Sequence, residues 1–208
     1  MEVASFGWNL GTFVAVVVLG FALWQAWGLR KQYQSIVRLG HAKVVSVTKF
    51  GSATVFFFLS GIYGHSIGSV VLPLTALILV VMSLPVMYAL HYYEGYTVRE
   101  KRWLSLFAST IPVMTIAPQQ FKATLFLVFA FARMIPFASQ PVEMYREKKV
   151  GAIDIRLFWA YLTGAFFWVT FYFIVLSDWI LRILSVMNTS ILLITVILYY
   201  RYREEPKV

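Results

Sequence analysis

The stretch GAFFWVTFYFIVLSDWILRILSVMNTSILLITVILYYRYR, residues 164–203, holds two long apolar runs with a short polar break at Asp178. Within each run the apolar residues follow one another continuously, whereas a membrane-spanning β-strand would alternate apolar and polar side chains. A helix needs roughly 20 mostly apolar residues to cross the hydrocarbon core of a bilayer. The second run meets this length, and the first meets it when extended upstream to residue 157. Both runs therefore predict membrane-spanning helices.

The same character extends over the whole chain. Its 208 residues are 60% hydrophobic and only 13% charged, and the mean hydropathy is +0.75. An ordinary soluble domain is about half apolar and about a quarter charged, so a soluble fold of this size could not bury so much apolar surface. We expect an all-α membrane protein with one membrane domain, residues 1–208. Seven spans are predicted, to within a few residues: 8–29, 50–67, 68–92, 103–117, 121–145, 157–176 and 179–200.

Most of the 18 Lys and Arg residues gather in four segments between or after these helices, at 30–49, 99–102, 146–156 and 201–207. Cytoplasmic loops of membrane proteins collect Lys and Arg. All four segments lie on one side only if the chain crosses seven times, with its N-terminus outside and its C-terminus in the cytoplasm. This distribution explains the net charge of +9 by anionic lipid head groups, without nucleic acid.

Seven helices can be divided as three, one and three. Residues 8–92 would form a first triple-helix unit, residues 121–200 a second, and the helix 103–117 would link them. Two units of three helices in direct succession would have opposite orientations in the membrane, because each has an odd number of helices. A single linking helix between them gives both units the same orientation. The fold class that we predict is therefore two parallel triple-helix bundles joined by an inversion linker helix, an internal repeat of the kind found in transporters.

The second unit begins with FASQPVEMYREKKVGAID, residues 137–154. Together with residues 164–203 it resembles the PQ-loop family, and within it the SWEET and SemiSWEET sugar transporters. Ser139-Gln140 stands where that family has its Pro-Gln pair. The other matching positions are the basic stretch Tyr145, Arg146 and Lys148, the Gly–Trp–Tyr pattern Gly164, Trp168 and Tyr172, the acidic turn residue Asp178, and Asn188 within the last helix.

The first unit matches this pattern less closely. Gln25 lies at a depth like that of Gln140, Ser60 stands where the second unit has Trp168, and Thr75 stands where Asn188 would be. Hinge prolines of the SWEET kind occur only in the helix 121–145, as Pro136 and Pro141. The resemblance therefore implies the fold more strongly than it implies a sugar-transport mechanism.

The resemblance implies a transporter that moves a small polar solute, with a sugar as the best guess, by alternating access. Its solute site would lie at the bilayer midplane, where polar residues usually face the bundle interior. Asn188 could instead bond another helix, and Trp168 could simply pack. The expected solute-binding residues are Asn188, Trp168, Thr75, Ser60 and Arg133. The expected gating or conformational residues are Gln25, Gln140, Pro136, Pro141 and Asp178.

Two arginines lie within apolar segments. Arg133, near the middle of its helix, needs a counter-ion, which could be an acid from another helix, Asp178 or Glu143, or an anionic group of a ligand. Arg182 follows Asp178 by one helical turn, so we expect these two to form a structural pair near the outer surface.

Two further functions remain open at this stage. A seven-helix receptor or sensor could recognise a carboxylate-bearing ligand through Arg133, and a proton-coupled amino-acid transporter of the PQ-loop type could use Glu143 and Asp154 as proton carriers. A retinal protein would need a Lys in the last helix, which has none. No catalytic constellation or P-loop is present, so we expect neither an enzyme nor a cofactor or metal site. The expected partners are a small-molecule solute and membrane lipids; the sequence leaves a homo-oligomer open.

Overall fold

The computed structural model describes residues 7–42, 45–150, 152–176 and 178–203, and these residues form helices and short connections without a strand. A π-helix of 5 residues, η2, directly follows α7 and continues it. The elements are α1 (Leu10–Leu39), α2 (Val47–Ser66), α3 (Val71–Glu94), α4 (Val98–Ala108), α5 (Thr110–Ile116), α6 (Gln119–Glu147), α7 (Ile155–Phe171), η2 (Tyr172–Leu176) and α8 (Trp179–Tyr202).

Local sequence explains where several helices begin. The side chains of Asn9, Ser46, Asp154 and Asp178 each accept a hydrogen bond from a backbone N–H in the first turn of the helix that follows. Small polar residues are favoured at this position because the first N–H groups of a helix have no partner within it. Before α4, Thr97 and Glu100 form a capping box, in which the side chain of each accepts a hydrogen bond from the backbone N–H of the other.

Several predicted bounds change. The first helix, expected at 8–29, continues to Leu39 and ends at Gly40, whose φ of 65° only glycine adopts readily. The linker, expected at 103–117, begins at Val98, and Ser109 separates α4 from α5 while keeping a right-handed helical conformation. Hydropathy misses these extensions because the added turns are polar, although they continue the helix.

Five of the described helices are long and apolar enough to cross a membrane, namely α1, α3, α6, α7 with the start of η2, and α8. The other two predicted spans fall short by this measure: α2 begins with polar residues, and α4 and α5 are individually short. Large apolar side chains such as those of Phe13, Leu77 and Ile135 are more than half exposed on the outside of the bundle. Such a surface suits acyl chains and not water, and it indicates an integral membrane protein.

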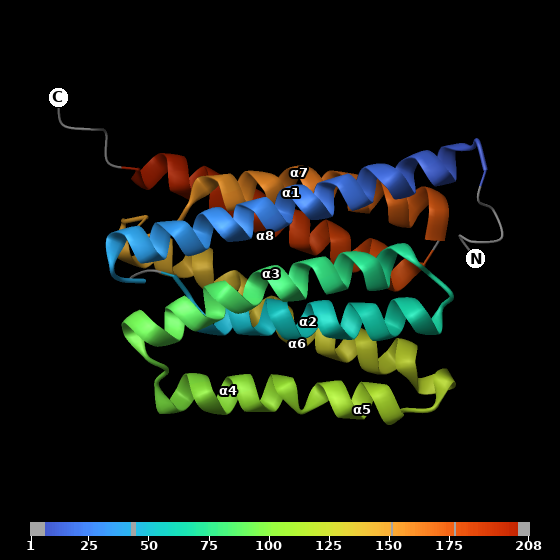
Figure 1. Ribbon diagram of the computed structural model, residues 1–208, viewed down its shortest axis with the longest axis horizontal. Coiled ribbons are helices and arrows are strands. Elements are labelled where there is room, and N and C mark those ends of the chain that lie inside the picture. Colours follow the sequence, from blue (N-terminus) through green and yellow to red (C-terminus); the bar gives the residue numbers. More distant parts are fainter. Residues whose placement is uncertain (1–6, 43–44, 151, 177, 204–208) are drawn as a thin grey trace.

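The helices run along one common axis (Figure 1). α1 begins and α8 ends at opposite ends of the bundle. α1, α3, α6 and α8 run in one direction along it, and α2, α4–α5 and α7 run in the other. The first three helices therefore have the same sequence of directions as α6, α7 and α8, with α4–α5 reversing the chain between the two sets.

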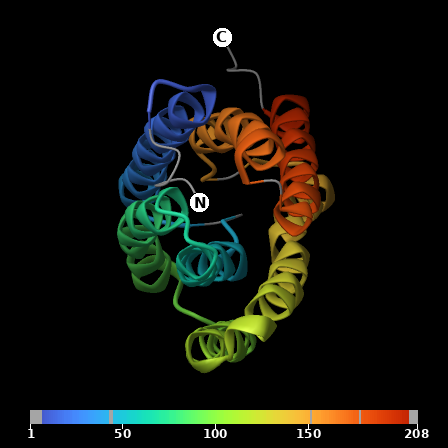
Figure 2. The same cartoon turned by 90° about the vertical axis from the view of Figure 1, so that its right-hand side faces the viewer.

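The contacts between helices follow a repeated order. α3 packs against both α1 and α2, and α8 packs against both α6 and α7. The two sets meet where α1 packs on α7 and where α2 packs on α6. Viewed along the bundle, these six helices form a ring, and α4 and α5 lie outside it beside α2 and α6 (Figure 2). The first helix of each set therefore contacts the second helix of the other.

Glycine permits close packing where the two sets meet. A Cβ atom added to Gly28 of α1 would lie 3.0 Å from the Cα of Leu157 in α7. A Cβ added to Gly164 of α7 would collide with the amide of Gln25. Small residues at helix interfaces in membranes let the backbones approach closely, which is a main source of packing energy there.

We therefore expect Gly28→Val to destabilise the protein, because the added methyl groups would press on the backbone of α7. The free energy of unfolding should fall by about 1–3 kcal/mol, as for other overpacked sites. The matched control is Gly20→Val on the same helix, where an added Cβ meets no atom within 4 Å. Thermal unfolding in detergent measures both variants, and equal stability of the two would contradict close packing of α1 on α7.

Candidate solute-binding cavity

A cavity of about 130 Å³ lies inside the ring of six helices, and we call it the central cavity. Its walls come from α1, α2 and α3 on one side and from α6, α7, η2 and α8 on the other. Along α2 it extends from Lys49, near the start of the helix, to Ser60, near its end. The polar residues that line it are Gln25, Lys49, Ser60, Thr75, Arg133, Tyr161, Trp168, Tyr172, Ser185 and Asn188.

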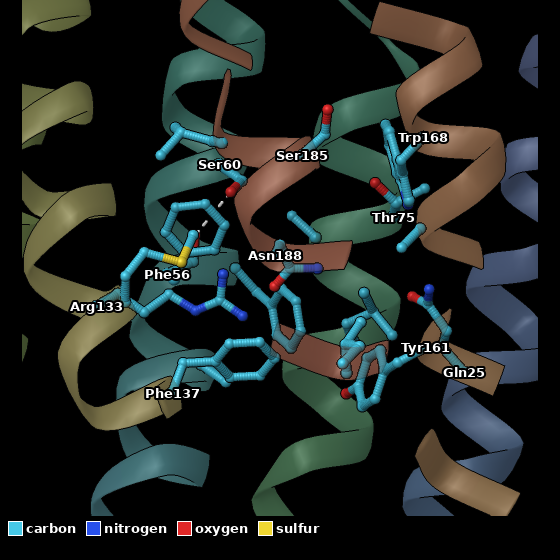
Figure 3. A pocket seen from close by; sticks show the side chains of 18 of the residues that line it. Gln25, Phe56, Ser60, Thr75, Arg133, Phe137, Tyr161, Trp168, Ser185 and Asn188 are labelled. Carbon is cyan, nitrogen blue, oxygen red and sulfur yellow. Dashed lines mark hydrogen bonds between the residues drawn. The ribbon is translucent and has the colours of Figure 1, made fainter. Parts of the chain in front are cut away.

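All five residues that the sequence indicated for solute binding line this one cavity (Figure 3). Asn188 lies at its centre, with Arg133 and Phe56 on one side and Thr75 and Trp168 on the other. They come from five different helices, α2, α3, α6, α7 and α8. The fold thus brings them together, and their role in binding stays a prediction.

The hydroxyl groups of Ser60, Thr75 and Ser185 donate hydrogen bonds to backbone carbonyls of their own helices. Ser60 donates to the Phe56 carbonyl at 2.8 Å, Thr75 donates to the Val71 carbonyl at 2.9 Å, and Ser185 donates to the Arg182 carbonyl at 2.8 Å. Their oxygen lone pairs remain available as acceptors. The side chain of Asn188 differs from these hydroxyls, because its Oδ1 is buried and has no hydrogen-bond partner among the described residues.

Two cationic side chains are buried at the cavity. Arg133 is 7% exposed and Lys49 is 6% exposed. Neither the Arg133 Nε nor the Lys49 Nζ has a hydrogen-bond partner in the described part of the chain. The sequence placed Lys49 in the segment between the first two helices, and this placement is wrong: it lies in the first turn of α2, because Ser46 begins the helix about one turn earlier than hydropathy indicated.

Aromatic rings are the nearest neighbours of both cations. The Arg133 guanidinium lies 4.3 Å from the centre of the Phe56 ring and 4.8 Å from that of Phe137. The Lys49 Nζ lies 3.9 Å from the centre of the Phe158 ring. A cation over an aromatic ring gains about 0.5–2 kcal/mol, whereas a charged Arg or Lys at membrane depth costs about 2.5–3.5 kcal/mol or more. The rings therefore offset only part of the cost of burying these charges.

Trp168 is half-buried and forms part of an aromatic cluster. Its ring stacks on Tyr172, with centroids 5.1 Å apart, and meets the edge of Phe171 at 5.5 Å. Tyr172 is the first residue of the π-helix η2, which follows α7. Short π-helical turns of this kind are frequent at functional sites. The stacking holds the Trp168 ring in place at the cavity wall.

The residues expected for gating lie at different places. Gln25 is 3% exposed, lines the cavity and lies over Gly164. Gln140 is 1% exposed but lies outside the cavity lining, as do Pro136 and Pro141, which are both within α6. Asp178 lies in the turn before the last helix, α8, as the sequence indicated.

Asp178 joins the two sets of helices. Its Oδ2 accepts a 2.6 Å hydrogen bond from the Tyr63 hydroxyl of α2, while its Oδ1 caps α8. The Tyr63 ring also stacks on Phe126 of α6, with centroids 4.4 Å apart. Tyr63 follows Ser60 by about one helical turn, so this bond lies just beyond one end of the cavity.

The predicted ion pair between Asp178 and Arg182 is wrong. Instead, Arg182 donates from Nε to the Tyr172 carbonyl at 3.1 Å and from Nη2 to the Phe173 carbonyl at 2.9 Å. These carbonyls belong to η2, where the regular α-helical hydrogen bonds are interrupted. The spacing of Asp178 and Arg182 places them one helical turn apart. In the structure, however, Arg182 bonds the two backbone carbonyls and Asp178 bonds Tyr63.

Other hydrogen bonds join the two sets beyond the opposite end of the cavity. The hydroxyls of Ser46, just before α2, and Ser139, in α6, lie 3.2 Å apart. Gln32 of α1 donates to the Ala152 carbonyl at 3.1 Å and accepts from the Asp154 N–H at 3.0 Å. Along α2, the cavity-lining stretch is therefore bracketed by Ser46 and Tyr63, and each of them bonds the other set of helices.

Sequence reasoning missed Lys49, Tyr161 and Ser185 as cavity residues. Ser185 precedes Asn188 by three positions, a spacing that places both on one face of a helix. The signal for Lys49 was its place directly before an apolar run. Tyr161 carried no such signal, because aromatic residues are frequent throughout this chain.

A comparison with solved structures found one described as the 3.7 Å resolution structure of a eukaryotic SWEET transporter. The match has a TM-score of 0.65 and 12% sequence identity, and it covers 92% of this chain and 96% of that chain. Comparisons with models of protein families and with curated protein sequences found no match. This protein is therefore an all-helical membrane protein with a SWEET-like fold, as the resemblance in its sequence predicted.

We expect Arg133→Met to leave the thermal stability unchanged or higher, because an apolar side chain of similar length removes a buried, unpaired charge. The matched control is Arg182→Met, which should lower stability by about 1–3 kcal/mol because two backbone carbonyls lose their donor. Melting curves of the two variants in detergent decide the matter. An equal loss of stability in both would mean that Arg133 has a structural role that its contacts do not reveal.

Proposed function

We propose that this protein is a transporter that carries a small polar solute across the membrane by alternating access. One observation carries the proposal. A cavity that is lined by apolar and aromatic residues, with several polar side chains among them, lies between the two sets of three helices, and hydrogen bonds join these sets beyond both of its ends. The SWEET-like fold makes a sugar such as glucose the first solute to test.

The two sets act in this proposal as two parallel units, residues 8–92 and 121–200, with residues 103–117 as the linker. The repeated packing order and the paired contacts of α1 with α7 and of α2 with α6 support this division. Both sets would contribute to the binding site, so rocking of one against the other would expose the cavity to each side in turn. The basic segments support an outer N-terminus and a cytoplasmic C-terminus.

The proposed roles follow from position. Asn188, Trp168, Thr75, Ser60 and Arg133 bind the solute, because each lines the cavity. Gln25 adjusts the fit of α1 against α7, because its side chain fills the space over Gly164.

The two prolines of α6 act as a hinge. Pro136 and Pro141 lack the N–H that would bond the carbonyls one turn before them, which weakens the helix locally. Gln140 lies between them, and the neighbouring Ser139 makes the hydrogen bond to Ser46. A bend at these residues would therefore change the contact between α6 and α2 at this end of the cavity.

The transport activity is tested by uptake of labelled polar solutes, beginning with glucose, into liposomes that contain the purified protein. We expect Asn188→Ala to reduce uptake roughly tenfold, because a buried amide that bonds the solute would be lost. Its stability should change little, since the Asn188 Oδ1 has no protein partner. Thr189→Ala is the control, because Thr189 bonds its own helix and does not line the cavity. Folded protein that moves no solute would exclude the proposed function.

The bond between Tyr63 and Asp178 should hold the outer end of the cavity closed. We expect Tyr63→Phe to open this end more often, because it removes the hydrogen bond while keeping the ring that stacks on Phe126. The chain has no cysteine, so Ser60→Cys supplies a single thiol in the cavity. A membrane-impermeant maleimide added outside should label it roughly tenfold faster in the Tyr63→Phe background.

The control for this labelling is Tyr88→Phe, because Tyr88 is exposed on α3, stacks on Tyr92 and does not line the cavity. It should leave the labelling rate unchanged. If Tyr63→Phe also leaves the rate unchanged, the hydrogen bond does not control access to the cavity.

A further inference from the structure

The wall of the central cavity carries positive charge and no negative charge. Arg133 and Lys49 both line it, and no Asp or Glu does. Each cation is more than nine-tenths buried. In the described part of the chain, neither forms an ion pair or has a hydrogen-bond partner for the buried nitrogen, Nε of Arg133 and Nζ of Lys49. These two unpaired groups therefore present donors to whatever occupies the cavity.

Neither cation is bonded to a counter-ion in the described part of the chain. The charges of Lys49 and Arg133 are close enough to act on each other, so each makes the other more costly to bury. Glu143 attracts Lys49 more strongly than Arg133 repels it, but no ion pair joins the two among the described residues, and Glu143 does not line the cavity. Around Arg133 lie the rings of Phe56 and Phe137, which attract a cation but accept no conventional hydrogen bond.

The direction of Arg133 matters as well. Its side chain extends from α6 toward Asn188 at the centre of the cavity (Figure 3). The planar guanidinium of arginine offers donors in a fork that matches the two oxygens of a carboxylate or phosphate. The unpaired Oδ1 of Asn188, in contrast, can accept a hydrogen bond from a hydroxyl or amine of the same ligand.

The volume limits the size of the ligand. A cavity of roughly 150 Å³ accommodates benzene, and the central cavity, at about 130 Å³, is slightly smaller. Lactate has as many non-hydrogen atoms as benzene, whereas glucose has about twice as many. The cavity in this conformation therefore fits a small hydroxy acid better than an intact hexose.

We infer that the solute of this transporter is a small organic oxyanion, about the size of lactate, whose acidic group binds between Arg133 and Lys49. This inference rests on the proposed transport function and names its substrate class. The apolar and aromatic walls exclude water from the charges, which strengthens their attraction for an anion. The hydroxyl of the solute is bound by Asn188 and the neighbouring polar side chains.

Binding to the full chain in detergent tests the inference, because a ligand that binds only the folded state raises the melting temperature. The probes are lactate, inorganic phosphate, lactamide and glucose, compared at equal ionic strength. We expect lactate to raise the melting temperature and lactamide, its uncharged counterpart, to leave it unchanged. Stabilisation by phosphate in place of lactate would assign the oxyanion as a phosphate. Equal effects of lactate and lactamide, or stabilisation by glucose alone, would overturn the inference.

Charge variants identify the site. Arg133→Gln should weaken lactate binding at least tenfold, because a charge-assisted bidentate contact is lost. Lys122→Gln removes a cation from the same helix outside the cavity and should leave the affinity unchanged. Arg133→Lys keeps the charge without the fork and should also bind lactate more weakly, so it decides the matter if Arg133→Gln does not fold. Unchanged affinity in either Arg133 variant overturns the inference.

Uptake of labelled lactate and glucose into liposomes separates this inference from the transport function. Lactate that binds through Arg133, with uptake of neither lactate nor glucose, supports the oxyanion site and contradicts the transport function. Glucose uptake without lactate binding supports transport and overturns the oxyanion site. Uptake of lactate, inhibited by phosphate or not, that is lost in Arg133→Gln supports both.

Discussion

Hydrocarbon offers no hydrogen-bond partners, and this constraint governs both the fold and the site. It requires the backbone to bond itself, which helices do. It also requires polar side chains to bond their own helix or to face the interior. Ser60, Thr75 and Ser185 meet the requirement by donating to carbonyls one turn before them. The Arg133 Nε and the Lys49 Nζ make no such bond in the described part of the chain, and both side chains line the central cavity.

The cavity exists because the helices pack closely in some places and cannot do so in others. Gly28 and Gly164 bring α1 and α7 together, and Gly64 brings α2 against Leu72 of α3. Bulky rings, including those of Phe56, Phe137 and Trp168, stand between the two sets of helices at the centre. Tight contacts at the edges of the ring and large side chains at its centre therefore leave space along the axis.

The two sets of helices are joined by close packing, of α1 on α7 and of α2 on α6, and also by side-chain hydrogen bonds. Beyond the ends of the cavity, the sets are joined by a few hydrogen bonds, such as those of Tyr63 with Asp178 and of Ser46 with Ser139. A few such bonds are each worth only a few kcal/mol at most, so a solute that binds one arrangement better than another can shift the balance between them.

The sequence by itself determined the helices, their approximate limits and the polar residues that lipid would reject. Apolar length predicted the spans, the cost of exposing Asn188 to acyl chains predicted its inward position, and the resemblance indicated Thr75; both residues line the cavity. Only the tertiary structure decided the partners. Asp178 bonds Tyr63 and not Arg182, and Lys49 enters the cavity and does not remain in a loop. Spacing along the sequence indicates only which residues are neighbours on one helix. These contacts join α2 to residues far away in the chain, so they form only after the two sets of helices have packed.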